Sequence, residues 1–192
     1  MAPPSKSAQA LKSFDGFFPK DPGTREAAGN ASDHAPPTIA ALLRRDGLGS
    51  YGRQALWTCN PAEWAAAATR WLPGRARADA YLRTAFGDLF IWDGEMFWFA
   101  MVHEGVVAGS VDDDAWFLSR TLGPQGLPSL HQSLPHRIAR AKSIAGELAA
   151  NEMYAYVPAL ALGGTEEDSR IVRVPALEHL AMLAELGISE RP

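Results

Sequence analysis

Apolar residues recur at helical spacing in several segments of the chain and form strand-like runs near its middle. Ile39, Leu42 and Leu43 occupy positions i, i+3 and i+4 of one such segment, which predicts a buried helix face. Asn60-Pro61 opens another as an N-cap followed by a proline at the first helical position. The predicted helices cover residues 36–46, 61–72, 112–121, 135–148 and 175–186.

Residues 80–110 have the pattern of an antiparallel meander. Apolar runs alternate there with turn signals, and Asp93-Gly94 between two such runs is a strong β-hairpin signal. The predicted strands cover 81–86, 88–92, 95–102 and 106–110, with short strands at 54–58 and 171–174. Helices before and after the strands predict an α+β fold. We expect an antiparallel β-meander flanked by helices, with a C-terminal portion of helices and a short strand.

The first 35 residues lack these patterns. Residues 1–12 are polar and are predicted to be a loose tail. The stretch from Phe14 to Pro19 holds three aromatic residues and is predicted to dock onto the domain. Residues 20–35 are polar and rich in glycine and alanine, which predicts a loop or a mobile linker of unassigned role.

Composition places the chain among ordinary globular proteins, with 47% hydrophobic and 21% charged residues among 192. Cys59 is the one cysteine, so no internal disulfide is possible, and this favours a reducing compartment. Residues 1–10 have no apolar stretch of signal-peptide length, and the longest apolar run, 96–102, is far short of the roughly 20 residues of a membrane span. We therefore predict a cytoplasmic protein with no membrane partner.

The net charge of −4 argues against nucleic acid as the direct ligand, because phosphate binding relies on lysine and arginine. The same charge is compatible with a basic protein partner. It is also normal for a protein with no charged partner, so charge alone does not distinguish these two interpretations.

Candidate chemistry is sparse. The five histidines have no metal-ligand spacing with one another or with Cys59, which favours surface or structural roles. Cys59 precedes a predicted helix start and could be a nucleophile with a lowered pKa, but no partner base is marked, and a small buried side chain is the favoured interpretation. The stretch 162–165 (LGGT) lacks the known phosphate-loop patterns and fits a turn. The sequence thus predicts a binding module without catalytic residues, cofactor or metal.

Two acidic clusters stand out, at residues 112–114 and 166–168. Neither has the fixed spacing of oxygen ligands of a calcium loop. One interpretation is a solvated helix start, where carboxylates complement the helix dipole. The other is an acidic surface that meets a basic cleft on another protein.

Two longer motifs resemble known domains. LWTCNPAEW at 56–64, followed by RTAFGDLFIW at 83–92, resembles the GAD-like domain. EMYAYVPALALGG at 152–164, followed by 172–186, resembles the C-terminal domain of type VI secretion DNase-immunity proteins, although Tyr156 stands where that pattern has phenylalanine. The resemblance divides the chain into a tail and loop (1–35), a GAD-like domain (36–122) and an immunity-protein C-terminal domain (123–192), the last two forming one compact unit.

This resemblance implies an immunity protein that binds and neutralises a cognate type VI secretion toxin by stoichiometric protein–protein inhibition. Several such toxins are nucleases, and the expected toxin is a DNase. The motif residues have structural explanations as caps, turns and packing residues, so the toxin-binding surface is expected outside the motifs. The candidate contact residues are the acidic clusters and a neighbouring aromatic residue: Asp112, Asp113, Asp114, Trp116, Glu166, Glu167 and Asp168.

Two alternatives remain at this stage. The first is a small-ligand-binding or regulatory module with an aromatic pocket formed by Trp92, Phe97, Trp98 and Phe99, although strand alternation directs about half of these into the core. The second is an enzyme that uses Cys59 or a histidine. The sequence carries no prediction of the oligomeric state.

Overall fold

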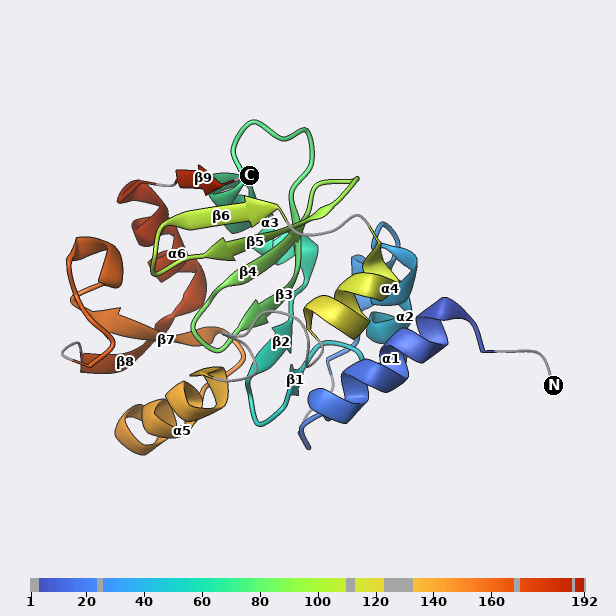
Figure 1. Ribbon diagram of the computed structural model, residues 1–192, viewed down its shortest axis with the longest axis horizontal. Coiled ribbons are helices and arrows are strands. Elements are labelled where there is room, and N and C mark those ends of the chain that lie inside the picture. Colours follow the sequence, from blue (N-terminus) through green and yellow to red (C-terminus); the bar gives the residue numbers. More distant parts are fainter. Residues whose placement is uncertain are drawn as a thin grey trace.

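The computed structural model describes residues 4–23, 26–109, 113–122, 133–167, 170–187 and 189–191. A seven-stranded sheet forms the centre of this part of the chain (Figure 1). Its order follows the sequence from β1 to β6, each strand antiparallel to the next, and β9 is added parallel to β6. The strands are β1 (Ser50–Tyr51), β2 (Leu56–Thr58), β3 (Asp79–Thr84), β4 (Leu89–Trp92), β5 (Phe97–Met101), β6 (Val106–Gly109) and β9 (Ser189–Arg191). The predicted meander is thus confirmed and extended at both edges.

A second, two-stranded antiparallel sheet consists of β7 (Glu152–Val157) and β8 (Arg170–Pro175). It is tied to the main sheet by the Tyr154 N–H, which donates to the Ala85 carbonyl at 2.9 Å. The prediction placed a short strand at 171–174 and did not recognise the apolar run from 154 as its partner. Together the two sheets and the helices confirm the predicted α+β class.

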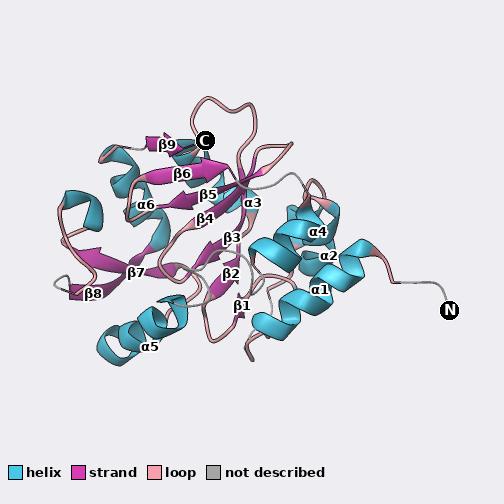
Figure 2. Ribbon diagram, viewed as in Figure 1, coloured by secondary structure: helices cyan, strands magenta, loops and turns pink. Residues whose placement is uncertain are grey.

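Helices group around these sheets in separate sets (Figures 1 and 2). Those at the N-terminal end, α1, α2 and α4, lie together, α3 and α6 pack on each other behind the main sheet, and α5 lies beside the second sheet. The helices are α1 (Lys6–Phe17), α2 (Pro37–Asp46), α3 (Pro61–Trp71), α4 (Asp114–Trp116), α5 (Leu134–Ala145) and α6 (Ala176–Glu185), with short helical turns η1 (Gly29–Ser32), η2 (Phe117–Thr121) and η4 (Leu160–Leu162).

The central strands are buried on both faces because helices cover both. Phe90 and Phe99 belong to one apolar core, whereas their neighbours Ile91 and Trp98 belong to the other. Adjacent side chains of a strand point to opposite faces, so the continuous apolar runs of β4 and β5 supply both cores at once. Burial of this kind accounts for the absence of polar alternation in these strands.

The N-terminal segment differs from the prediction. Residues 6–17 form α1 rather than a loose tail, and Ser5 caps the helix by accepting from the Ala8 N–H at 3.2 Å. Ala10 and Phe14 are buried, and Phe14 meets Tyr51 edge-on with ring centroids 5.3 Å apart. The predicted docking of the aromatic stretch is confirmed, since Phe18 is buried as well.

Residues 20–35 contain a loop, as predicted, but much of it follows the first edge of the main sheet. Isolated bridges join Lys20 to Tyr51 and Glu26 to Leu48, and the turn η1 buries Ala31. In the C-terminal helix, Leu180 and Leu183 are buried, whereas Leu177, in the first turn of α6, is 41% exposed.

Gly87 allows a close approach between the two sheets. Its φ is +83°, and a Cβ at this position would lie 2.4 Å from Cε of the buried Met153. Gly87→Ala is expected to lower the free energy of unfolding by about 2–3 kcal/mol, through the positive φ and the displacement of Met153. Gly74→Ala is the matched control because its φ is +79° and its Cβ would meet nothing within 4 Å. If urea unfolding shows equal losses of unfolding free energy in Gly87→Ala and Gly74→Ala, a role for the Met153 contact is contradicted.

Candidate functional site

The first predicted acidic cluster lies on α4, and its two described carboxylates are used within the fold. Asp113 caps α4 by accepting from the N–H groups of Ala115 and Trp116, both at 2.9 Å. Asp114 accepts from the Thr38 N–H at the start of α2. The helix-start interpretation therefore holds for both residues, whereas Asp112 lies outside the described residues.

Trp116 is different because 47% of its surface is exposed, and the described residues offer its indole N–H no acceptor. Beside α4 an open groove of about 590 Å³ runs to the start of α1. Its lining consists of Lys6, Ser7, Pro36, Pro37, Trp92, Asp113, Asp114 and Ala115. The structure thus brings part of the predicted contact set to one shallow surface.

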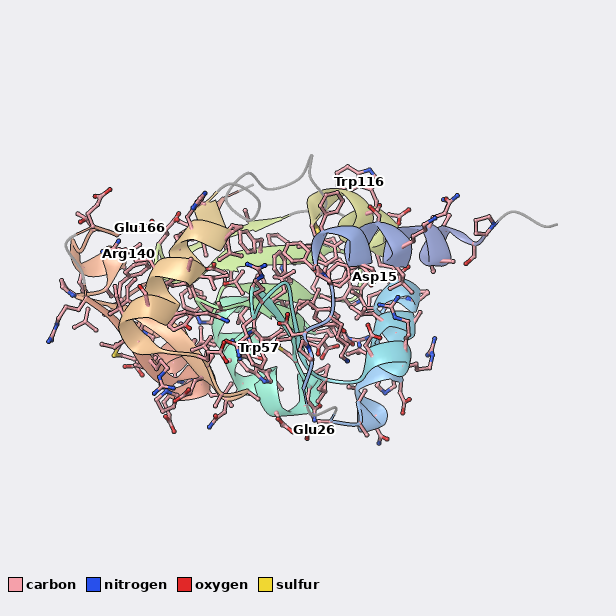
Figure 3. All side chains as sticks on the ribbon, turned by 90° about the horizontal axis from the view of Figure 1, so that it is seen from below. Asp15, Glu26, Trp57, Trp116, Arg140 and Glu166 are labelled. Atoms are coloured by element: carbon pink, nitrogen blue, oxygen red, sulfur yellow. The ribbon has the colours of Figure 1, made fainter. Side chains whose placement is uncertain are left out.

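The second predicted cluster lies in the turn between η4 and β8. The Arg140 guanidinium donates to the backbone carbonyls of Glu166 and Glu167 at 2.6 and 3.2 Å, and the Glu166 carboxylate pairs with Arg137 at 3.2 Å. Glu167 is exposed, and Asp168 lies outside the described residues. Figure 3 shows Glu166 beside Arg140 at one end of the molecule and Trp116 towards the other, so the two clusters form separate surfaces.

A cleft of about 530 Å³ forms a third surface, which the sequence did not reveal. It lies where the N-terminal loop, the first edge of the main sheet and the starts of α3 and α6 meet. Residues from both halves of the chain line it: Lys20, Asp21, Pro22, Gly23, Glu26, Leu48, Gly49, Ser50, Gln54, Trp57, Thr58, Asn60, Glu63, Trp64, Ala150, Asn151, Pro175, Ala176, Leu177 and Glu178. Figure 3 shows Trp57 near the middle of this side of the molecule and Glu26 at its lower margin.

Arg83 lies against the two tryptophans of the cleft and is itself buried. Its guanidinium carbon is 4.9 Å from the Trp57 ring and 5.3 Å from the Trp64 ring, within cation–π range. Its donors reach the carbonyls of Ala150 at 2.7 Å and Thr84 at 3.3 Å. Burial lowers the pKa of Arg83 to about 10, so the side chain is still protonated at neutral pH. This arginine therefore fixes one wall of the cleft.

Among the residues considered as nucleophiles or ligands, Cys59 and His103 are buried. Burial raises the pKa of Cys59 to about 12, which removes the lowered pKa that a nucleophile would need and supports the buried interpretation. Burial and the nearby His179 lower the pKa of His103 to about 3, and the two rings are 6.1 Å apart. In the described ranges, no three His, Cys, Asp or Glu side chains are grouped to hold a metal ion.

The structure also tests two other expectations from the sequence, the turn at 162–165 and the aromatic pocket. Gly163 adopts the left-handed conformation at the end of η4, which confirms the turn interpretation of 162–165. Phe97 and Phe99 are buried in one core and Trp98 in the other, so the predicted aromatic pocket is wrong. Strand alternation sends these neighbouring side chains to opposite faces.

Asp88 of the GAD-like motif links the two halves electrostatically. It accepts from the Thr84 hydroxyl at 2.9 Å and from the Val102 N–H at 3.2 Å. Burial raises the pKa of Asp88 to about 6, although the positive charge of Arg137 opposes this shift. Arg137 in turn packs over Phe86, with its guanidinium 4.4 Å from the ring centroid, and donates to the Tyr156 hydroxyl at 3.1 Å.

The residues that line the cleft could not have been grouped from the sequence, because Glu26, Trp57 and Glu178 are far apart along the chain. Periodicity marked Trp64 as a core residue, which is correct for most of its surface. The available signal was the position of Glu63 and Glu178 in the first turns of two helices. Acidic residues in the first turn of a helix complement the helix dipole, so the positions of these two glutamates did not indicate a binding site.

Comparison with known proteins gives two matching sequence families. Residues 134–187 match the family described as "T6SS immunity protein Tdi1, C-terminal", and residues 8–102 match the GAD-like domain. The two segments together span most of the chain. No curated protein matches the chain in sequence.

Among solved structures, Atu4351 from Agrobacterium tumefaciens is similar, with a TM-score of 0.73 at 17% sequence identity. The alignment covers 94% of this chain and 91% of that protein. At this level of identity the likeness shows a shared fold. In the described part of this chain, no helix is both long and apolar enough to cross a membrane.

The fold is α+β, and the two matched segments lie in the order that the two sequence motifs indicated. The chain therefore has one segment similar to the C-terminal region of Tdi1-type immunity proteins, which follows a segment similar to the GAD-like domain.

Proposed function

We propose that this protein binds a cognate type VI secretion toxin, a DNase, in the cytoplasm and neutralises it by stoichiometric association. The match of residues 134–187 to the Tdi1 C-terminal family carries the proposal. The DNase part rests on the resemblance of the 152–164 motif to DNase-immunity proteins. A DNA-cleaving domain needs a basic surface for phosphate, and the acidic character of this chain is complementary to such a surface.

Co-expression tests this function directly. The toxic domain of the effector encoded beside this protein would be produced in a bacterium with and without it, followed by survival, genomic DNA integrity and co-purification. We expect survival with an intact genome and a one-to-one complex. Death of the cells despite equal expression, with no complex, would overturn the immunity function for that toxin. Survival with a toxin that leaves DNA intact would overturn the DNase assignment alone.

We propose that the α4 surface, with Asp112 to Asp114 and Trp116, and the turn with Glu166 to Asp168 contribute to toxin binding. Trp116 and Glu167 are the clean probes, because their side chains have no structural partner among the described residues, whereas Asp113 and Asp114 hold helix starts. Charge reversal at Asp113 or Asp114 would confuse a binding effect with a folding effect.

Trp116→Ala is expected to weaken toxin binding by about tenfold or more, because exposed tryptophans are enriched among residues that dominate interface energies. Unfolding stability should change by less than about 0.5 kcal/mol, as is usual at an exposed site. Ile144→Ala on α5 is the control, since Ile144 is an exposed apolar side chain at 56%. Isothermal titration with an inactivated toxin measures the affinity of both variants. An unchanged affinity in Trp116→Ala would remove α4 from the interface.

A further inference from the structure

The cleft is lined by residues of both matched segments, including Trp57, Glu63 and Trp64 of the GAD-like motif. Trp57 and Trp64 line it and are each 7% exposed, while Leu177 is exposed on its C-terminal side. Its volume of about 530 Å³ is that of a small-ligand pocket and exceeds a single side chain, so it accommodates a short peptide segment. A partner seated here would contact the GAD-like domain and the C-terminal region together.

The charge around the cleft is strongly one-sided. Four carboxylates line it, from Asp21, Glu26, Glu63 and Glu178, against one ammonium, from Lys20. The ammonium is already bound to the Asp46 carbonyl. Asp21 is likewise occupied, because it accepts from the N–H groups of Arg53 and Gln54.

The other three carboxylates remain available to a partner. Glu63 accepts from the Asn60 side-chain amide at 2.9 Å and is exposed. Glu26 and Glu178 are exposed too, and their carboxylates make no hydrogen bond or ion pair with the described part of the chain, although the Glu26 carbonyl accepts from the Leu48 N–H. The cleft thus offers aromatic walls with acceptors at their margin, the combination that suits a cation with an apolar stem.

The buried cation beneath the tryptophans does not reverse this preference. The Arg83 donors are directed to the backbone carbonyls of Ala150 and Thr84, and Arg83 does not line the cleft. Its contact with both rings holds the indoles in place before any partner arrives. Such preorganisation lowers the entropic cost of binding.

We propose that this cleft receives a basic segment of the toxin, with an arginine or lysine side chain lying against Trp57 and Trp64 and paired with Glu26, Glu63 or Glu178. An arginine fits best, since its guanidinium stacks on aromatic rings and pairs with carboxylates through two hydrogen bonds. This inference rests on the proposed function and names the chemistry of the partner at one surface.

A matched pair of double variants tests the proposal with the full-length protein. Glu26→Lys with Glu178→Lys reverses two charges of the cleft, and Glu95→Lys with Glu185→Lys reverses two exposed charges that do not line it. Both change the net charge equally, so long-range steering is matched. We expect the cleft variant to bind an inactivated toxin at least about tenfold more weakly, with a change under about twofold in the control.

A separate control for folding effects is needed, because Glu178 also complements the dipole of α6. Glu26→Lys alone is the second variant, since the Glu26 carboxylate lies in a loop and has no such role. It should retain the unfolding midpoint and still weaken binding by about threefold or more.

Cross-linking identifies the occupant. Leu177→Cys, labelled with a photo-reactive maleimide, is expected to capture a toxin peptide that contains arginine or lysine. Cys59 is buried and does not compete for the label.

The possible results distinguish a failure of the cleft assignment from a failure of the immunity function. Equal affinity in the two double variants, with wild type binding and rescuing cells, overturns the cleft assignment and leaves the immunity function standing. Failure of the wild-type protein to bind the toxin overturns both. Thermal stabilisation of the free protein by millimolar arginine or spermidine, lost in the cleft variant while toxin binding is unchanged, would show that the cleft holds a small cation and would overturn the peptide occupant.

Discussion

Phe86→Ala is expected to lower the free energy of unfolding by about 3–5 kcal/mol, the range for removing a buried aromatic ring. The Phe86 ring is inaccessible to solvent and stacks on Tyr156 with centroids 5.3 Å apart. It also packs against Tyr154 at 5.6 Å and carries the Arg137 guanidinium on its face. Alanine would remove the ring that both halves of the chain share. Urea unfolding followed by tryptophan fluorescence and by circular dichroism measures the loss.

The same substitution at an exposed site provides the control. Phe17→Ala on α1 removes an identical ring that is 42% exposed, and a loss under about 1 kcal/mol is expected there. Because Phe86 joins the residues of both motifs, wild type should unfold in one transition detected equally by both probes. Two separated transitions, or a loss for Phe86→Ala no larger than that for Phe17→Ala, would contradict this role. The division of the chain at residues 36, 122 and 123 stays a prediction until such unfolding data exist.

Local signals in the sequence predicted the middle of the fold well. Asn60-Pro61 marks the start of α3, where the Asn60 side chain accepts from the Ala62 N–H at 3.2 Å. The hairpin signal at Asp93-Gly94 separates β4 from β5, and Asp93 accepts there from the N–H groups of Glu95 and Met96. These features depend on neighbours within a few residues, so the sequence pattern carries them almost completely.

The misses arose where distant segments decide the structure. Helix α1 buries only Ala10 and Phe14 of its twelve residues, so its pattern resembles that of a polar tail. Its burial depends on contacts with η2 and α2 and on the packing of Phe14 against Tyr51 of β1, which no local pattern can show. The β1 strand, two residues long, exists because it pairs with β2. Tertiary contacts thus override weak local preference.

The candidate binding surfaces show the same difference between features set by local sequence and features set by distant segments. Sequence reasoning singled out Trp116 and offered a helix start for the acidic cluster, but it missed the bond of Asp114 to the Thr38 N–H, which belongs to another helix. The cleft was missed altogether. Its walls come from four segments that are brought together by the pairing of β2 with β3 and by the contact of α6 with α3.

Arg83→Ala is expected to cost about 3–4 kcal/mol of unfolding free energy. The change would leave a void between Trp57 and Trp64 and would remove the part-buried hydrogen bond to the Ala150 carbonyl. Ala150 lies in the turn before β7, so the lost hydrogen bond is one that joins β3 to the C-terminal half. Arg70→Ala on the exposed side of α3 is the control, with an expected change under about 0.5 kcal/mol.

Two further substitutions at Arg83 distinguish the contribution of its packing to stability from that of its charge. Burial lowers the pKa of this guanidinium, which means that the fold disfavours the charged form, and no carboxylate contacts it in the described residues. Arg83→Met keeps most of the volume without the charge, whereas Arg83→Lys keeps the charge without the planar surface that stacks on two indoles. We therefore expect methionine to restore at least half of the stability lost with alanine, and lysine to restore less. A lysine variant more stable than the methionine variant would show that the positive charge itself stabilises this junction, and that the two tryptophans are held by cation–π attraction more than by packing.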